Sequence, residues 1–428
     1  MAQKMKDSGI AWIGIVPDCW KVYQLGQLAE QVKKRNEGLR EQNLLSLSYG
    51  KVKRRDINSS DGLVPASYET YNIIEPGDVI LRFTDLQNDQ KSLRVGQADE
   101  RGIITSAYTT IMPNADVSAR FLFYVLAAFD FRKGFYGMGA GVRQGLKWQE
   151  AKYILIVLPP LDEQRRIADY LDSKCTDIDA AIEAAEDNFS EYQYLRTSLI
   201  SEAVTTGLDR DVKMAPTTSR WMHELPIGWH LRKLKALSTY ISDGVHKTPE
   251  YTVEGVPFLS IKDVSSCKIK FDDCKYISVE QHKTLSKSTP VEDGDVLFTR
   301  IGTLGKSVVV RNCPEFDIFV SLGIVKPKTD LIIPEYLSYV MQSGYYMEYI
   351  QHVKVDGKNA AAKFNLGDVR KSPIVLPPMA AQRSIVKYLD GLCDDIDKAL
   401  SAKRSIIADL KSYKQSLIYE FVTGKREV

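Results

Sequence analysis

The side chains best suited to chemistry in this 428-residue chain are basic ones, gathered in two short clusters between residues 33 and 55. The denser cluster follows an apolar run at Leu44–Tyr49, and the smaller one lies upstream of it. Arginine and lysine in loops can reach DNA phosphates and guanine edges. The candidate DNA contacts here are Lys33, Lys34, Arg35, Tyr49, Lys51, Lys53, Arg54 and Arg55. Such clusters are also common on faces that only meet solvent, so they indicate DNA contact without requiring it.

The second half of the chain has two polar loops of a similar kind. Residues 244–249 read Gly-Val-His-Lys-Thr-Pro, and residues 354–363 begin and end with lysine. Small, polar and basic residues in loops can approach both a phosphate backbone and base edges. The candidates for DNA contact in these loops are His246, Lys247, Lys358 and Asn359.

Two strands that begin with a Gly-Asp pair each carry an arginine. Arg82 is the fourth residue after Asp78, whereas Arg300 is the fifth residue after Asp295. Strand side chains alternate between faces, so these arginines should point in opposite directions unless a bulge intervenes. Both are candidate DNA contacts. We expect the two halves of the chain to share a scaffold but not a surface chemistry.

A glycine-rich turn at Phe135–Gly139 fits F-x-G-x-G, the AdoMet-binding turn of methyltransferases. The pattern is too short to be specific, and no Asn/Asp/Ser-Pro-Pro-Tyr/Phe motif accompanies it to orient a target amine. We therefore interpret the following loop as a carrier of two DNA-contact candidates, Arg143 and Gln144. No Ser/His/Asp, Cys/His, phosphate-loop or clustered nuclease carboxylate pattern occurs. The five histidines and six cysteines show no metal-ligand spacing, so we predict neither catalysis nor a metal site.

These candidate residues lie on a chain that contains one module twice. Residues 374–400 repeat residues 156–182 with 16 identities in 27 positions at a constant offset of 218. Upstream, Trp12, Pro17, Trp20, Leu25 and Leu28 recur as Trp221, Pro226, Trp229, Leu234 and Leu237, and Gly77-Asp78-Val79 recurs as Gly294-Asp295-Val296. Two copies with so long a period exclude a solenoid. They predict a duplicated module and an approximate internal two-fold.

Each copy is predicted to be a mixed lobe followed by a long helix. Apolar runs bounded by turn residues predict short strands in both lobes. These strands are Leu44–Tyr49, Val79–Phe83 and Ile154–Leu158 in the first lobe, and Val256–Ile261, Val296–Arg300 and Ser307–Val310 in the second. The aromatic-rich runs Phe121–Phe129 and Glu335–Met341 predict short helices.

A proline pair ends the last strand of each copy, and a long helix should follow it. Proline is harmless in the first turn of a helix and disruptive later, so the first helix should begin near Leu161. Apolar residues then alternate spacings of four and three, as in a coiled coil, with a break at Arg196. Cys175 and Cys393 lie on this seam as small core residues. The positions that we expect to pair the helices and dock partner subunits are Leu171, Ile178, Ile182, Phe189, Leu389, Ile396, Leu400 and Leu410.

The predicted fold class is α+β. Neither apolar stripe can be buried alone, so we expect two mixed α/β lobes separated by two long helices that form an antiparallel coiled coil, with pseudo-two-fold symmetry. The predicted boundaries are residues 1–158 for the first lobe, 159–208 for a central helical spacer, 209–376 for the second lobe and 377–428 for a C-terminal helical spacer. A helix of about 44 residues would span roughly 66 Å, close to two turns of B-DNA.

Charge is unevenly distributed along the chain, although the whole chain carries only +2. Residues 1–155 carry +4, residues 156–215 carry −7, residues 216–372 carry +3 and residues 373–428 carry +2. An acidic helix suits a protein partner better than a phosphate backbone. No apolar stretch approaches the roughly 20 residues of a membrane helix, and no secretory signal precedes the first tryptophan. We expect a cytoplasmic protein without a membrane partner.

Taken in order, these motifs resemble the specificity subunits of type I restriction–modification systems. The residues that carry the resemblance are Trp12–Pro17 with Trp20, the Pro-Pro helices with Gln164-Arg165 and Gln382-Arg383, the Gly-Asp-Val strands, and Gly255–Leu259. The resemblance covers nearly the whole chain. One departure is Ala380-Ala381, where the first copy has Asp162-Glu163, and this loss should weaken the start of the second helix.

The resemblance implies that the lobes are two target recognition domains, each reading one half of a bipartite DNA sequence, with the helices as a ruler between them. It implies double-stranded DNA, two methyltransferase (modification) subunits and restriction subunits as partners. The chain itself would be non-catalytic and bind no cofactor, whereas AdoMet, ATP and Mg²⁺ would be bound by the partners.

Three other interpretations stay open. The chain could serve a system whose methyltransferase and nuclease share one polypeptide, it could be a self-sufficient AdoMet-dependent DNA methyltransferase, or it could be a scaffold without DNA contact. Binding of AdoMet by the purified chain would identify the second of these, and we expect none.

Overall fold

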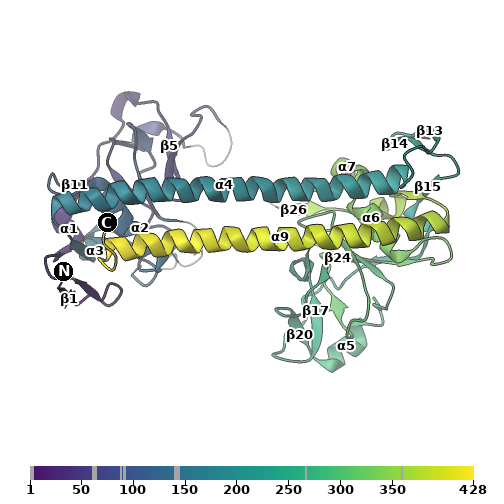
Figure 1. Cartoon of the computed structure of the whole chain (residues 1–428). Helices are drawn as coiled ribbons and strands as arrows, with labels where there is room; N and C mark the ends of the chain where they lie inside the picture. Colours follow the sequence, from purple (N-terminus) through teal and green to yellow (C-terminus); the bar gives the residue numbers. More distant parts are fainter. Residues whose placement is uncertain are drawn as a thin grey trace. The chain divides into compact units, whose positions relative to one another are not determined.

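The structure is a computed structural model, and it describes residues 4–428 except 60–64, 87–88, 90–92, 139–144, 266–267 and 358–359. The chain divides into two compact units. Unit 1 comprises Met1–Ala185 and Ile406–Val428, and unit 2 comprises Glu186–Ser405. Each unit contains one mixed lobe together with a stretch of each long helix, α4 (Leu161–Thr206) and α9 (Met379–Val422) (Figure 1).

The first lobe precedes α4 in the sequence and consists of short strands and short helices. Its strands are β1 (Met5–Asp7), β2 (Ile15–Pro17), β3 (Lys21–Gln24), β4 (Ala29–Val32), β5 (Leu45–Ser48), β6 (Lys51–Arg54), β7 (Asn72–Ile74), β8 (Val79–Leu81), β9 (Val95–Gln97), β10 (Gly102–Ile104), β11 (Thr109–Pro113) and β12 (Leu155–Leu158). Its helices are α1 (Leu25–Leu28), α2 (Ala119–Phe131) and α3 (Trp148–Ala151).

The main sheet of the first lobe is antiparallel, with strand order β4-β11-β8-β9. Strand side chains alternate between faces, and the sheet uses both faces. Val79 and Leu81 enter the large core shared with α2 and the long helices, whereas Ile80 enters a smaller core with Leu45 and Leu47. The β5–β6 hairpin therefore covers the face of the sheet that α2 leaves open.

The second lobe lies between α4 and α9 in the sequence and has the same design. Its strands are β13 (Met214–Ser219), β14 (Met222–Pro226), β15 (His230–Lys233), β16 (Ser238–Asp243), β17 (Val256–Leu259), β18 (Val264–Ser265), β19 (Lys268–Ile269), β20 (Lys275–Ile277), β21 (Val296–Thr299), β22 (Ser307–Val309), β23 (Asp317–Ile318), β24 (Leu322–Pro327), β25 (Val355–Gly357), β26 (Ala360–Lys363) and β27 (Pro373–Leu376). Its helices are α5 (Val279–Leu285), α6 (Pro334–Gln342), α7 (Gly344–Val353) and α8 (Leu366–Lys371).

The main sheet of the second lobe repeats that of the first. Its order is β16-β24-β21-β22, again antiparallel throughout. Val296 and Phe298 face the core that contains α6 and the long helices, and Leu297 faces a smaller core. A three-stranded sheet, β20-β17-β23, covers that second face, and its β17–β23 pair is parallel. The two lobes thus share the scaffold that the duplication predicted.

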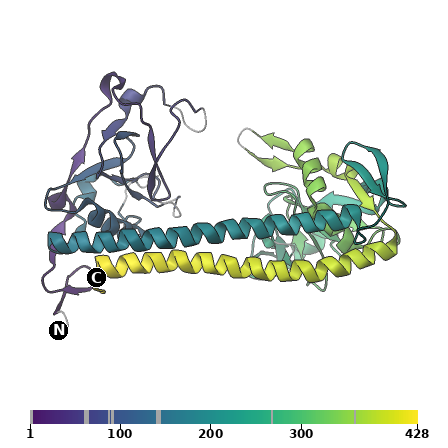
Figure 2. The same cartoon turned by 45° about the horizontal axis from the view of Figure 1, so that its top comes forward.

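The long helices run antiparallel within each unit, as expected. In unit 1, Tyr170 on α4 packs against Phe421 on α9, with ring centroids 4.6 Å apart, and farther along α4 the contact with α9 falls at Lys414. In unit 2, the Arg404 guanidinium on α9 lies 5.4 Å from the ring centroid of Phe189 on α4. Farther along α4 in the same unit, Arg196 pairs with Asp397 on α9. Within each unit, residue numbers therefore fall on α9 as they rise on α4, and both views show the two helix segments of a unit side by side (Figure 1 and Figure 2).

The predicted seam lies between these helices. Its buried members are Leu171, Ile178, Ile182, Leu389 and Ile396, and its half-buried members are Phe189, Leu400 and Leu410. Cys175 and Cys393 are buried on the same seam. The break at Arg196 has a physical reason, because its Nε lies 3.1 Å from Asp397 Oδ1 and fills the seam with an ion pair. The docking role of these positions stays a prediction.

A buried glutamine fixes the start of each long helix. Gln164 Oε1 accepts a hydrogen bond from the backbone N–H of Ser118, the N-cap of α2, at 2.8 Å. Gln382 Oε1 likewise accepts from the backbone N–H of Ile333, the N-cap of α6, at 2.9 Å. Each amide group also donates to a carbonyl of the preceding proline pair. The glutamines of the two Gln-Arg pairs are therefore structural.

The expected weakening of the second helix start does not alter its position. α9 begins at Met379, the residue that the repeat aligns with Leu161 at the start of α4. In the first copy Glu163 Oε1 accepts a hydrogen bond from the Trp20 indole at 3.2 Å, a contact that Ala381 cannot make. The hydrogen bonds of Gln164 and Gln382 are present in both copies, and they keep the two long helices starting at equivalent residues.

The strand and short-helix predictions are confirmed, with ends shortened by one to two residues in several strands and helices extended outward by one or two. The sequence ranges for lobes and spacers stay predictions, because the compact units divide each long helix instead of separating helices from lobes. Within the described part of the chain, none of the helices combines the length and the apolar character needed to cross a membrane.

Candidate nucleic-acid interface

The β5–β6 hairpin presents Tyr49 at its tip. Only Tyr49 and Gly50 join the two strands, and their φ angles are 48° and 77°. A two-residue turn with positive φ at both positions matches the twist of paired strands, and glycine adopts it readily. Tyrosine adopts it at a cost of about 1–2 kcal/mol. The Tyr49 side chain is nevertheless 81% exposed. The backbone strain and the exposure of the aromatic ring keep Tyr49 among the contact candidates.

Gly96 on β9 allows the hairpin to pack closely against the main sheet. A Cβ atom at Gly96 would lie 2.4 Å from Leu47 Cδ1 and 3.2 Å from Val52 Cγ2. Leu47 is buried in the smaller core, and Val52 packs against it. The hairpin is therefore a packed arm of the first lobe that carries a fixed tip.

The remaining basic residues of β6 and its C-terminal end are exposed. Arg54 pairs with Glu100, with its Nε 2.7 Å from Oε1. Exposed ion pairs of this kind contribute at most about 1 kcal/mol, so the Arg54 guanidinium is only weakly held by Glu100. Lys53 is exposed on the same strand, and Arg55 lines a cavity of about 330 Å³. Three tyrosines share that cavity, namely Tyr68, Tyr71 and Tyr108.

The upstream basic cluster follows β4 directly, and its three side chains are exposed. Lys34 Nζ lies 3.3 Å from Glu75 Oε1, and the Arg35 guanidinium donates to the backbone carbonyl of Thr70. Lys33 lies next to them at the end of the strand. The structure therefore places both predicted clusters on the first lobe with their charges open to solvent.

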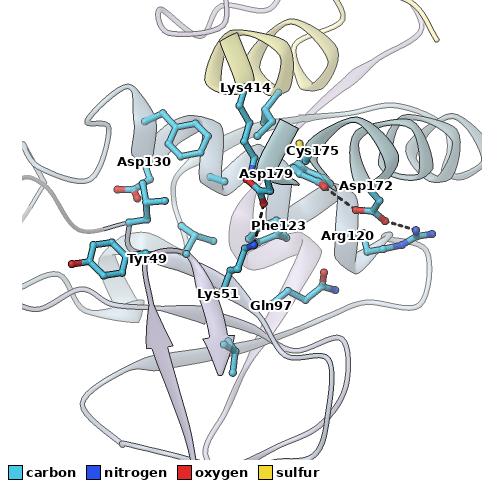
Figure 3. A pocket seen from close by; sticks show the side chains of 18 of the residues that line it. Tyr49, Lys51, Gln97, Arg120, Phe123, Asp130, Asp172, Cys175, Asp179 and Lys414 are labelled. Carbon is cyan, nitrogen blue, oxygen red and sulfur yellow. Dashed lines mark hydrogen bonds and ion pairs between the residues drawn. The ribbon is translucent and has the colours of Figure 1, made fainter. Parts of the chain in front are cut away.

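A cavity of about 510 Å³ lies between the hairpin and the helices of unit 1 (Figure 3). On its helical wall, Asp179 of α4 faces two ammonium groups. Lys414 Nζ of α9 lies 2.6 Å from Asp179 Oδ1, and Lys51 Nζ of β6 lies 3.0 Å from Asp179 Oδ2. Burial opposes the charge on the carboxylate, but the hydrogen bonds from Lys414 and Lys51 outweigh it and lower the pKa of Asp179. Lys51 is thus a link to the helices as well as a DNA-contact candidate.

The same cavity contains the contact that attaches α2 to α4. The Tyr124 hydroxyl donates to Asp172 Oδ1 at 2.8 Å, and Arg120 donates to Asp172 Oδ2 at 2.6 Å (Figure 3). Burial raises the pKa of the neighbouring Cys175 thiol, which disfavours the reactive thiolate. Unit 2 repeats the arrangement, because the hydroxyl of Tyr339 on α6 donates to Asp390 on α9 at 2.7 Å beside Cys393.

The loop after β8 is held from inside the lobe. Arg82 is half-buried, and its guanidinium lies 3.1 Å from Asp89 Oδ2. Arg94 is fully buried and donates to the carbonyls of Arg82 and Thr84 at 3.2 and 2.7 Å. Its backbone N–H donates to Asp130 Oδ2 at 2.7 Å, and burial raises the pKa of Asp130 to about 6. Arg82 stays a candidate for DNA contact, and the buried Arg94 holds the backbone of its loop.

The first polar loop of the second lobe requires one correction. His246 and Lys247 are exposed as predicted, and His246 Nε2 lies 3.1 Å from Asp243 Oδ2. Arg300 is only 4% exposed, its guanidinium donates to Asp243, and its Nε donates to the Phe364 carbonyl at 3.4 Å. Arg300 therefore fixes the base of the loop from within the lobe, and we remove it from the DNA-contact candidates.

The second lobe contains a basic hairpin that was not predicted from the sequence. Lys268, Ile269 and Lys270 repeat the Lys-Val-Lys of residues 51–53 at offset 217, the offset that also relates the two Gly-Asp-Val strands. They lie on and just after β19, which pairs with β18. Lys268 lines a cavity of about 270 Å³ with Arg196, Asp394 and Asp397. The hairpin could have been predicted, because its Lys-x-Lys triplet repeats at the same offset as the Gly-Asp-Val strands.

Four predicted residues lie outside the described part of the chain, namely Arg143, Gln144, Lys358 and Asn359. The methyltransferase-like turn also reaches that region, at Gly139. Its Phe135 is fully buried, with ring centroids 5.3 Å from Phe83 and 4.8 Å from Phe129, and it follows α2. Glycine turns that bind nucleotide cofactors join a strand to a helix. Phe135, the first residue of this turn, therefore packs in the hydrophobic core of the first lobe.

The residues that the structure describes contain no cluster of three His, Cys, Asp or Glu side chains able to hold a metal ion. Besides the exposed His246–Asp243 contact, a largely buried His–Asp pair lies in the second lobe. His282 Nδ1 lies 2.7 Å from Asp317 Oδ2, and burial raises the pKa of Asp317. The pair joins α5 to β23 and is part of the second lobe's interior.

Comparison with known proteins agrees with this architecture. Residues 226–403 match the family model for the type I restriction modification DNA specificity domain. The type I restriction enzyme EcoBI specificity subunit of Escherichia coli is 22% identical over 63% of this chain, and the match spans only 58% of that subunit. The MjaVIII specificity subunit of Methanocaldococcus jannaschii is 21% identical over 96% of this chain and 94% of its own length.

A solved chain has a similar fold over nearly the whole length. It comes from work described as the structural basis underlying complex assembly and conformational transition of the type I R-M system. It aligns with a TM-score of 0.62 and 19% identity, covering 96% of this chain and 99% of its own. At that identity the likeness concerns the fold.

In sequence and in fold the chain is therefore similar to type I restriction–modification specificity subunits, the resemblance that the motifs indicated.

Proposed function

We propose that the chain selects the DNA target of a type I restriction–modification complex, and that each lobe reads one half of a bipartite duplex sequence. The observation that carries this proposal is the duplicated module, in which each lobe holds a Lys-x-Lys hairpin against its own stretch of the helix pair. A cytoplasmic location is part of the proposal.

Phosphate contacts would supply the salt-dependent, sequence-independent part of the affinity. Exposed lysines and arginines are suited to this role. On the first lobe they are Lys33, Lys34, Lys53, Arg54 and Arg55, and on the second they include Lys247 and Lys270. Base reading then needs a few well-held side chains, each good contact discriminating by about 1–3 kcal/mol. Tyr49 at the fixed hairpin tip is our first candidate for such a reader.

The helices would set the distance between the two half-sites and dock the methyltransferase subunits. The acidic balance of residues 156–215 supports a protein partner on this segment, because acidic side chains repel a phosphate backbone. In this proposal the methyltransferase subunits supply AdoMet and methylate adenine, and restriction subunits supply ATP- and Mg²⁺-dependent cleavage. This chain supplies recognition.

The test is the methylome of cells that express the chain together with its neighbouring methyltransferase gene. We expect adenine methylation at one motif with two specified halves and an unspecified spacer of fixed length. A continuous motif, or methylation that does not depend on this chain, would contradict the proposal. AdoMet binding by the purified chain, measured by calorimetry, should be absent, and its detection would favour a self-sufficient methyltransferase.

A further inference from the structure

Asp179 joins three elements of unit 1 at one carboxylate. It lies on α4, one oxygen accepts from Lys414 on α9 at 2.6 Å, and the other lies 3.0 Å from Lys51 on β6 (Figure 3). The three side chains differ in burial, with 31% of Asp179, 24% of Lys414 and 61% of Lys51 exposed. The interhelical half of the contact is thus partly buried, and the half that reaches the hairpin is open.

Unit 2 contains the same contact with the helices exchanged. The offset of the long-helix repeat relates Asp397 on α9 to Asp179, and it relates Arg196 on α4 to Lys414. Asp397 Oδ1 lies 3.1 Å from Arg196 Nε, and Arg196 also donates to Gln342 Oε1 of α6 at 3.0 Å.

A lysine of the second hairpin approaches this contact too. Lys268 lines one cavity together with Arg196 and Asp397, and its charge helps to lower the pKa of Asp394, whose main partner is Lys398. The pairing of a carboxylate with a cation on the opposite helix therefore recurs in both units, and in each unit a hairpin lysine lines the same cavity as that pair.

The Asp179 contact lies close to the hairpin tip. Lys51 is two residues from Tyr49, at the first pair of the hairpin, where Ser48 pairs with Lys51. Packing at Gly96 holds Leu47 and Val52, the pair next to Ser48 and Lys51, and the Asp179 contact ties Lys51 itself to α4. A side chain that reads a base edge must be held to within a fraction of an ångström by its supporting contacts.

We propose that Asp179 is a positioning residue for recognition of one DNA half-site by the first lobe, and that Asp397 is its counterpart for the second lobe. Asp179 acts through Lys51, which it ties to the helix pair so that Tyr49 and Lys53 meet the duplex in one orientation. The carboxylate also engages the Lys51 ammonium, which limits sequence-independent attraction to phosphates. This inference rests on the proposed function of the lobes.

The experiment uses the full-length chain in complex with its methyltransferase subunits. A randomised duplex library first identifies the bipartite site of the wild-type complex, and every single-base variant of that site is then titrated. The variants Asp179→Asn and Asp397→Asn are titrated on the same duplexes. Asparagine keeps the size of the side chain and removes the charge, and thermal melts of each complex show whether it remains folded.

We expect Asp179→Asn to reduce discrimination about tenfold at the bases of one half-site, to leave the other half-site unchanged, and to leave affinity for non-cognate duplex equal or higher. Asp397→Asn should reduce discrimination at the opposite half-site. Unchanged discrimination in both variants, or an equal loss at both half-sites, would overturn the inference while leaving the proposed function intact. A wild-type complex that selects no bipartite site would overturn both.

A double-mutant cycle keeps the inference testable if loss of the Lys414 contact perturbs folding. Lys51→Gln should reduce discrimination at the same half-site as Asp179→Asn. The double variant should lose no more discrimination than Lys51→Gln alone, because both changes remove one contact. Additive losses would show that Asp179 does not act through Lys51. Lys51→Arg, which keeps the ion pair, should restore discrimination toward the wild-type value.

Discussion

Tyr49 combines backbone strain with an exposed side chain, and these two properties can be separated by substitution. Asparagine adopts a positive φ more easily than tyrosine, so Tyr49→Asn should leave the free energy of unfolding equal or higher. It removes the aromatic ring, so discrimination at one half-site should fall by about 1–3 kcal/mol. Urea unfolding and duplex titration of the same preparation measure the two effects.

Gly50→Ala is the matched control for Tyr49→Asn. Its φ is 77°, and an added Cβ would lie 3.1 Å from Leu93 Cδ1. This change should lower the free energy of unfolding by about 1–2 kcal/mol while the tyrosine stays in place. If Tyr49→Asn weakened folding as much as Gly50→Ala does, the exposed ring would be a structural contact and not a reader.

Asp130 gives the first unit a pH-dependent stability. Burial raises its pKa to about 6 in the folded chain, above the ordinary value of 3.8. The folded state therefore holds this proton more tightly than the unfolded state, and stability falls as the pH rises from about 4 to 6. Asp130→Asn, which can still accept from the Arg94 N–H, should gain on the order of 3 kcal/mol over the wild type by pH 7.

Urea unfolding at pH 4, 5, 6 and 7 measures this difference between Asp130→Asn and the wild type. The difference should be small at pH 4 and level off above pH 6. Asp116→Asn, at an exposed position, serves as the control and should show a constant difference. The free energies of unfolding of Asp130→Asn and the wild type could instead differ by the same amount at all four pH values. That result would mean that folding does not raise the pKa of Asp130.

At the scale of elements, the sequence predicted those with strong local signals. Proline pairs gave the starts of both long helices, and Gly-Asp turns gave the strands at Val79 and Val296. The two-residue strands β18 and β19 were missed because so short a run has no periodicity to read. Their pairing is visible only through the repeat of the Lys-x-Lys triplet.

The candidate site shows the same limit. Local composition located the hairpin cluster around Tyr49, but it could not identify Asp179 as the partner of Lys51, because the two residues lie on distant elements of the sequence. Alternation predicts only that Arg300 and Arg82 point in opposite directions from their strands. Whether a covering element lies on that face depends on tertiary packing, and here Phe364 and Asp243 enclose the guanidinium.

The side-chain contacts that attach α2 to α4 in unit 1 and α6 to α9 in unit 2 should differ in strength. Tyr124 and Arg120 both donate to Asp172, whereas Asp390 receives the hydroxyl of Tyr339. Removing a donor from a partly buried carboxylate costs about 1–3 kcal/mol. Tyr339→Phe should therefore destabilise more than Tyr124→Phe, where Arg120 remains. Thermal melts of the two variants test this order, and the reverse order would contradict it.

For the whole molecule, independent reading by the lobes predicts the result of a lobe exchange. Replacing residues 1–158 with the corresponding segment of a relative should change one half of the methylated motif and leave the other half unchanged. The cut after Leu158 keeps the β3–β12 pair within one piece. Methylome sequencing of the chimera measures the outcome, and a change in both halves would show that the lobes do not read independently.

The reciprocal contacts of Asp179 with Lys414 and of Asp397 with Arg196 have a consequence for inheritance. In each unit the two partners are encoded far apart in the gene, so a crossover between related genes can separate them. Because both acidic partners are aspartate and both basic partners are cationic, a recombinant that keeps these residue types still brings opposite charges together. New combinations of lobes can therefore arise by genetic exchange without a repulsive helix contact.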